Sequence, residues 1–334
     1  MTMKLSILDQ SPIVHEGTAQ RSLHQSVELA KLAEEWGYGR YWAAEHHDSP
    51  GLSCTSPEIL LSRIGAETST IRLGTGGLLL PHYSAYRAAE TFHMLEALFP
   101  GRIDAGIGRA PGGMPRASLA LSEGRPRNVS RFPEQLDDLL NWLHYQPVEK
   151  YVYGEAKAGP YTETVPPVWI LGSSVKGAAL AASRGLPFTF AHFINEEETD
   201  QAASVYYEQF QPSKWLEKPS FMMAVSVVCA ATDEEAERMA KSVDLAVLSA
   251  EKGMPLPEIP GPEKAAAHDW SGYDGERQTE NRRRLIVGSA ESAGMRLKEL
   301  AKRTQASELM LISNLYSHET RLQSYQLIAE ELIP

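Results

Sequence analysis

Short apolar runs alternate with segments of helical periodicity along nearly the whole chain. Consecutive apolar residues are typical of strands buried on both faces, whereas apolar residues three and four apart predict amphipathic helices. The runs predict eight strands, at residues 4–8, 40–44, 71–80, 102–109, 167–171, 187–191, 220–232 and 307–313. Helices are predicted after nearly all of them, at 22–38, 56–69, 84–99, 131–145, 173–185, 196–210, from about 232 onward, at 289–304 and at the C-terminus.

Eight strand–helix units over 334 residues favour a TIM-like (β/α)8 barrel over a doubly wound sheet of six strands. No linker divides the chain, so residues 1–334 are predicted to form a single domain. Irregular segments near 110–130, 147–166 and 253–284 are expected to be insertions in the loops that follow strands. The last of these is the candidate for a mobile lid over a site.

Charge and cysteine content exclude several classes of function. The formal charge of −11 makes nucleic acid and anionic membranes unfavourable partners. Cys54 and Cys229 are too far apart in the sequence to suggest a disulfide framework or a zinc site. Without a signal-peptide pattern or a long apolar span, the sequence predicts a cytoplasmic protein.

Unusual polar and glycine residues stand where the predicted strands end. Active sites of barrel enzymes lie at the carboxyl ends of the strands, so these residues are expected to share one face. They are Glu45, His46 and His47 after the second strand, Gly76 and Gly77 in the third, Arg109 at the end of the fourth, and Gly172, Ser173 and Ser174 after the fifth.

Several kinds of chemistry fit these positions poorly. Neighbouring residues of an extended chain point in opposite directions, so His46 and His47 are not expected to bind one metal ion, and no metal site is predicted. Two glycine-rich stretches begin at residues 74 and 106, but they have Leu79 and Pro111 in place of the third glycine of a dinucleotide-binding fingerprint. The serines after the fifth strand lack the spacing of a hydrolase nucleophile.

Anion binding fits better. Gly172, Ser173 and Ser174 precede a predicted helix, where hydroxyl groups and unpaired N–H groups can hold a phosphate. Arg109 could add a charge-assisted contact; the alternative is a helix cap beside an unrelated surface arginine. Gly76 and Gly77 indicate either a flat ligand against the backbone or a kink in the barrel wall.

These same residues carry a family resemblance. The segments RYWAAEHH, IRLGTGGLLLPHYSAYRAAETFHMLEALFPGRIDAGIGRAPGG and PVWILGSSVKGAALAASRGLPFTFAHF, and the later VGSAES and ELMLIS, resemble the luciferase-like flavin monooxygenases. The resemblance implies an enzyme that binds FMN, usually in the reduced form delivered by a separate flavin reductase. It further implies that reduced flavin and O2 give a flavin hydroperoxide, which oxygenates a small organic substrate.

The resemblance also assigns roles to residues. Arg109 matches the arginine that holds the FMN phosphate, and Gly172, Ser173 and Ser174 match the phosphate loop. Gly76 and Gly77 match small residues against the isoalloxazine ring, where the family often has a non-proline cis peptide. Glu45 matches a glutamate near the flavin. His46 is the first catalytic candidate, with a pKa expected near neutral, and His47 is the second, its alternative role being a hydrogen bond within the loop.

Other functions and assembly states stay open at this stage. The same fold could serve an oxidoreductase dependent on F420 or NAD(P)H, or a flavin-binding protein without turnover. The resemblance implies a homodimer that pairs through the helices at 56–69 and 84–99.

Overall fold

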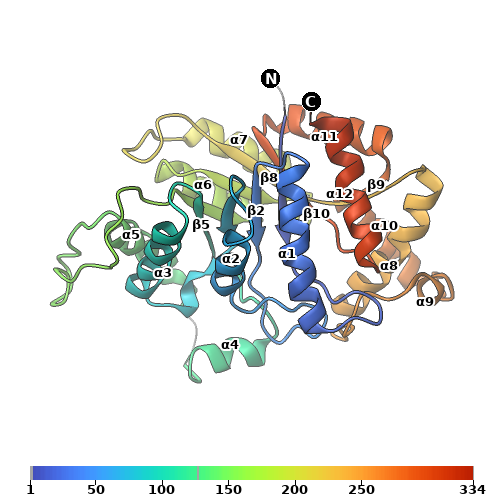
Figure 1. The fold of residues 1–334 in the computed structure, drawn as a ribbon, viewed down its shortest axis with the longest axis horizontal. Helices are drawn as coiled ribbons and strands as arrows, with labels where there is room; N and C mark the ends of the chain where they lie inside the picture. The colour runs from blue at the N-terminus through green and yellow to red at the C-terminus, as the bar shows by residue number, and fades with distance from the viewer. Residues whose placement is uncertain (1–2, 126–127, 334) are drawn as a thin grey trace.

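Eight parallel strands close into a barrel in the computed structural model, which describes residues 3–125 and 128–333 (Figure 1). The strand order is β10-β1-β2-β3-β5-β6-β7-β8, and β8 pairs with β10 to close the ring. The predicted TIM-like (β/α)8 barrel is confirmed. The barrel strands are β1 (Lys4–Asp9), β2 (Arg40–Ala43), β3 (Arg72–Thr75) continued by β4 (Leu78–Leu79), β5 (Ile103–Gly108), β6 (Val168–Gly172), β7 (Phe188–Ala191), β8 (Phe221–Ala230) and β10 (Glu308–Ile312).

Helices surround this barrel (Figure 1). None of those in the described part of the chain is long and apolar enough to cross a membrane. The helices are α1 (Ala19–Glu35), α2 (Pro57–Gly65), α3 (Ala85–Leu98), α4 (Pro115–Leu121), α5 (Phe132–Leu143), α6 (Val175–Ser183), α7 (Thr199–Gln209), α8 (Asp233–Glu251), α9 (Pro262–Ala266), α10 (Tyr273–Asn281), α11 (Ala290–Thr304) and α12 (His318–Leu332).

Three parts of the structure differ from the sequence-based expectation. The strand expected at 71–80 is interrupted by the cis peptide between Gly76 and Gly77, which separates β3 from β4. An additional strand, β9 (Leu285–Ser289), pairs with the outer half of β8 beyond the barrel. The segment expected to be irregular at 253–284 contains α9 and α10, and α10 packs against α8.

Alternation along each strand sorts its side chains between two apolar layers. On β2, Tyr41 belongs to the layer between strands and helices, whereas Trp42 belongs to the cluster inside the barrel. Inside, the rings of Trp42 and Trp169 meet edge to face with centroids 5.7 Å apart. A Cβ at Gly74 would lie 2.4 Å from the Trp42 indole nitrogen, so the glycine leaves room for this ring. Large side chains therefore fill the middle of the barrel.

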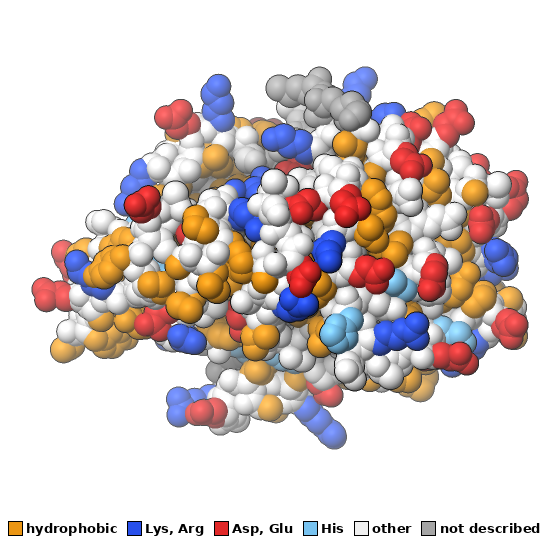
Figure 2. All heavy atoms as spheres, viewed as in Figure 1, with side chains coloured by type: hydrophobic (Ala, Val, Ile, Leu, Met, Phe, Trp, Pro, Cys, Tyr) orange, Lys and Arg blue, Asp and Glu red, His pale blue; other side chains and the backbone are white. Residues whose placement is uncertain are grey.

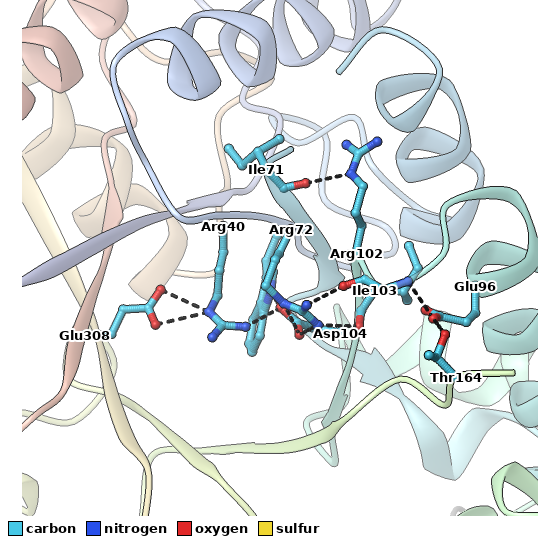
Figure 3. A network of polar contacts seen from close by, with 11 residues as sticks. Arg40, Ile71, Arg72, Glu96, Arg102, Ile103, Asp104, Thr164 and Glu308 are labelled. Atoms are coloured by element: carbon cyan, nitrogen blue, oxygen red, sulfur yellow. Dashed lines mark hydrogen bonds and ion pairs between the residues drawn. The ribbon is translucent and has the colours of Figure 1, made fainter. Parts of the chain in front are cut away.

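A network of buried charges lies across the amino-terminal mouth of the barrel (Figure 3). Arg40 donates to both carboxylate oxygens of Glu308, at 3.0 and 3.1 Å, and to Asp104 at 2.7 Å. Arg72 donates to the other oxygen of Asp104, and the Trp42 indole N–H donates to Asp104 at 3.1 Å. Since these residues come from β2, β3, β5 and β10, the network connects strands from across the barrel.

Asp104 is the residue on which this network depends, because its fully buried carboxylate faces two guanidinium groups. We expect Asp104→Asn to lower the free energy of unfolding by about 3–5 kcal/mol, because breaking a buried ion pair leaves uncompensated charge. Urea denaturation of the two proteins measures the difference.

The control for Asp104→Asn is Arg63→Ala. Arg63 pairs with Glu67 at 2.6 Å on the surface of α2, and its side chain is 60% exposed. The loss there should be under about 1 kcal/mol. Equal losses at the two positions would show that the barrel network adds no more than a surface pair.

Candidate functional site

A cavity of about 610 Å³ opens at the carboxyl ends of the barrel strands. Small residues at these ends leave room for it: Ala44, Gly108, Ala191 and Ala224 all line the cavity. The structure brings nearly all of the sequence-predicted site residues together there. Those lining the cavity are Glu45, His46, Gly76, Gly77, Arg109, Gly172, Ser173 and Ser174.

Glu45 organises the loop that follows β2. Its buried carboxylate accepts hydrogen bonds from the backbone N–H of Leu79 at 2.9 Å and from the Tyr83 hydroxyl at 2.9 Å. Its Oε1 also lies 2.8 Å from His47 Nε2. With all three groups around it, Glu45 fixes the loop after β2 against the end of β4.

His46 is the histidine of this loop that lines the cavity. Burial, reinforced by the neighbouring His47, lowers its pKa from 6.5 to about 4. The expectation of a pKa near neutral is therefore wrong, because burial disfavours the imidazolium. Its Nδ1 is buried without a hydrogen-bond partner among the described residues, so the ring is a neutral imidazole with one polar atom unsatisfied.

His47 does not line the cavity. Its side chain contacts Glu45, and its backbone N–H donates to the Gly112 carbonyl at 2.6 Å. His47 thereby connects the loop after β2 with the segment after β5. The contact between His47 and Glu45 is a hydrogen bond within the loop, which was the alternative to a catalytic role for His47.

The turn between β6 and α6 combines a helix cap with a face on the cavity. Ser174 is the N-cap of α6, and its Oγ accepts from the Gly177 N–H at 3.3 Å. Ser173 and Arg109 border the cavity from two different strand ends. The two sequence-based alternatives, a helix cap and an anion-binding turn, are thus compatible here. The Ser174 hydroxyl caps α6, and the turn also lines the cavity.

The wall at Gly76 and Gly77 also satisfies two requirements at once. A Cβ on Gly76 would lie 2.2 Å from Leu8 Cδ1, and one on Gly77 would lie 3.0 Å from the Gly106 carbonyl oxygen. The contact at Gly77 is with backbone atoms, so barrel packing disfavours a side chain there, whereas the contact at Gly76 is with the end of a leucine side chain. Both glycines also line the cavity.

The sequence missed two polar residues of the cavity wall. Thr189 on β7 is buried and lines the cavity, and its Oγ1 has no partner among the described residues. Gln10, directly after β1, accepts a hydrogen bond from Asn314 Nδ2 at 2.6 Å. The position of Gln10 at a strand end was the signal available, whereas Thr189 lies within an apolar run and gave none.

The cover of the cavity also differs from the expectation. No described residue of 253–284 lines the main cavity, whereas Ala110, Pro111, Gly112 and Val129 do; Asn281 and Arg284 of that segment line the adjoining chamber. A second chamber of about 230 Å³ shares Gln10, Phe193 and Ile194 with the main cavity and extends toward Asn314. The segment after β5 thus borders one side of the cavity, and the side chamber leads away from another.

The family model for luciferase-like monooxygenases matches residues 3–307. This range contains every residue that lines the cavity and ends just before the last barrel strand, β10. The chain belongs to the luciferase-like monooxygenase family. Membership of this family supports an oxidoreductase. The family resemblance read from the sequence is confirmed.

Relatives of this luciferase-like protein match it along its whole length. The uncharacterized protein YwcH of Bacillus subtilis is 44% identical over 98% of both chains. A luciferase-like monooxygenase of Escherichia coli is 34% identical, covering 99% of this chain and 98% of its own. The N-acetyl-S-alkylcysteine monooxygenase of Bacillus subtilis is 33% identical with the same coverage.

Solved structures confirm the luciferase-like fold. Apo-MsnO8 superposes with a TM-score of 0.92 at 37% identity, covering 99% of both chains. Two more distant structures share the fold alone. They are the oxygenating constituent of 3,6-diketocamphane monooxygenase in complex with FMN, with a TM-score of 0.74 at 20% identity, and an F420-dependent secondary alcohol dehydrogenase, with a TM-score of 0.73 at 13% identity.

The lowered pKa of His46 predicts a dependence of stability on pH. Between pH 6.5 and about 4 the unfolded chain binds a proton on this residue that the folded chain does not, so stability falls as the pH falls. As the pH falls across this interval, we expect the free energy of unfolding to fall less for His46→Gln than for the wild type, the difference being about 1–3 kcal/mol. Urea denaturation at a series of pH values measures it; parallel curves for the two proteins would contradict a buried, neutral His46.

Proposed function

We propose that this protein is a flavin-dependent monooxygenase that takes reduced FMN from a separate reductase and uses O2 to oxygenate a small organic substrate. The observation that carries the proposal is one cavity lined both by an arginine and two serines, which suit an anion, and by two adjacent glycines, which suit a flat ligand. Arg109 and the Ser173–Ser174 turn border it at two strand ends, and Gly76 and Gly77 form part of its wall.

The unsatisfied atoms of the cavity fit a polar ring system. His46 Nδ1 and Thr189 Oγ1 are buried without partners among the described residues. Buried polar atoms usually have hydrogen-bond partners, so such atoms at a cavity favour a bound ligand that supplies them. The carbonyl and ring N–H groups along one edge of an isoalloxazine are suitable partners.

Each part of the site then has a proposed role. Arg109, Ser173 and Ser174 hold the phosphate, and the Gly76–Gly77 backbone supports the ring. The bound reduced flavin supplies the electrons that activate O2. Since the segment at 110–112 lies along the cavity, it would limit the access of water to the reacting atoms.

His46 is the proposed catalytic residue. A neutral imidazole can accept a proton at one nitrogen while it donates a hydrogen bond from the other. His47, the second catalytic candidate from the sequence, is instead proposed to position His46, because it contacts Glu45 and the segment after β5. The side chamber next to Gln10 is the proposed entry for the organic substrate.

Ligand binding tests the cofactor assignment. We expect Arg109→Ala to weaken binding of FMN about 10- to 100-fold, because a charge-assisted contact to the phosphate is lost. Binding of riboflavin, which lacks the phosphate, should stay unchanged. Flavin fluorescence titration measures both affinities.

The control for Arg109→Ala is Arg116→Ala. Arg116 is an exposed residue of α4 that does not line the cavity. Both variants replace an arginine with alanine, so they change the net charge equally. Equal effects on FMN would contradict the role of Arg109.

Binding of F420 in place of FMN would favour the alternative, an F420-dependent oxidoreductase. Oxygenation itself is tested with reduced FMN and isotopically labelled O2 on N-acetyl-S-alkylcysteines, the substrate type in the name of one relative.

We also propose that the protein forms a homodimer through α2 and α3. These adjacent helices expose three large apolar side chains: Ile59 is 70% exposed, Met94 50% and Leu98 53%. Figure 2 shows hydrophobic side chains gathered over this part of the surface. Burial of such a surface in a pair would stabilise the assembly.

Sedimentation equilibrium tests the dimer. We expect a mass of twice 36.9 kDa for the wild type and a monomer for the double variant Met94→Asp/Leu98→Asp, because the new carboxylates would be buried in the interface. Met295→Asp is the control, since Met295 is 58% exposed on α11. Loss of the dimer in the control, or a dimer in the double variant, would contradict this interface.

A further inference from the structure

The loop after β7 reaches back onto the turn that forms the phosphate cradle. Asn195 Nδ2 donates to the Ser173 carbonyl oxygen at 2.9 Å. Glu198 accepts at Oε2 from the backbone N–H of Val175 at 2.7 Å. Val175 is the first residue of α6 and directly follows Ser174, so a carboxylate lies immediately beside the residues proposed to hold a phosphate.

This position is one that an anionic ligand would favour. The first N–H groups of a helix have no acceptor within the helix, and the helix dipole attracts negative charge to this end. In this chain Glu198 satisfies the N–H of Val175. A phosphate at Ser173 and Ser174 therefore approaches a helix end that already holds one negative charge.

We propose that Glu198 is a specificity-determining residue that weakens the hold of this protein on the flavin phosphate. The inference rests on the proposed function, because it assumes that the phosphate binds at the Ser173–Ser174 turn. If the carboxylate stays at Val175, it repels the phosphate across a few ångströms. If the phosphate displaces it, a hydrogen bond to Glu198 is lost. Either way the flavin binds less tightly, as suits a co-substrate that arrives reduced and leaves oxidised.

Glu198→Gln separates charge from hydrogen bonding. The amide oxygen of glutamine can still accept from Val175 N–H, so the turn keeps its contact while the negative charge disappears. We expect FMN to bind about 3- to 30-fold more tightly to this variant, with riboflavin unchanged. The gain should shrink between low salt and about 1 M salt, where charges are screened over a few ångströms.

Glu197→Gln is the matched control. Glu197 is the exposed neighbour of Glu198. This variant has the same net charge as Glu198→Gln and should bind FMN like the wild type. Glu198→Ala, which also releases the Val175 N–H, should tighten FMN binding as well, so the inference can be tested with a second variant.

The outcomes separate this inference from the proposed function. A wild type that prefers FMN to riboflavin, together with unchanged FMN affinity in Glu198→Gln and Glu198→Ala, overturns the role of Glu198 and leaves the cradle intact. Equal gains for FMN and riboflavin also overturn it, since the effect would not act on the phosphate. A wild type without any preference for FMN over riboflavin overturns the phosphate cradle, and with it both proposals.

Discussion

The buried charge network at the amino-terminal mouth of the barrel is the constraint on which the rest of the structure depends. Charged groups removed from water must find partners, and Arg40 finds them in Asp104 and Glu308. A hollow of about 490 Å³ lined by Arg40, Arg72 and Trp169 lies at that mouth. The rings of Trp42 and Trp169 fill the middle of the barrel, between this hollow and the cavity at the carboxyl ends of the strands. The side chains along the barrel axis thus differ in kind: charged groups lie at the amino-terminal mouth, tryptophan rings in the middle, and alanine and glycine at the carboxyl-terminal end. The small residues at that end leave room for the cavity.

Within the cavity, the loops depend on residues that do not themselves face a ligand. Glu45 collects hydrogen bonds from Leu79, Tyr83 and His47, so the position of His46 is fixed by its two neighbours in the sequence. The same arrangement raises the cost of charging His46, because its own ring is buried beside a second imidazole. A neutral imidazole can accept a proton at one ring nitrogen and donate a hydrogen bond from the other. A permanently charged side chain cannot do both.

Much of the fold was predictable because a buried parallel strand needs a continuous apolar run, and eight such runs stand in the sequence. β9 was missed because it lies outside the barrel and its five residues follow directly on a charged segment. The grouping of Glu45, Arg109 and Ser173 was predictable because the carboxyl ends of barrel strands meet at one face. The pKa of His46 and the packing of 253–284 were not predictable. Both depend on which residues from distant parts of the sequence lie beside them, and no local sequence pattern indicates this.

The charges around the turn between β6 and α6 bear on how long the proposed anionic cofactor would stay bound to an acidic protein. The net charge of −11 repels a phosphorylated flavin at long range, so binding must come from local groups that outweigh it. In the proposed function, Arg109 and the N-terminus of α6 would supply such attraction, and the Glu198 carboxylate, which reaches Val175 from the loop after β7, would oppose it. An attraction that is partly cancelled at close range gives a site that recognises the phosphate and still releases it. Such release is what distinguishes a flavin that moves between two proteins from one that stays bound to a single protein.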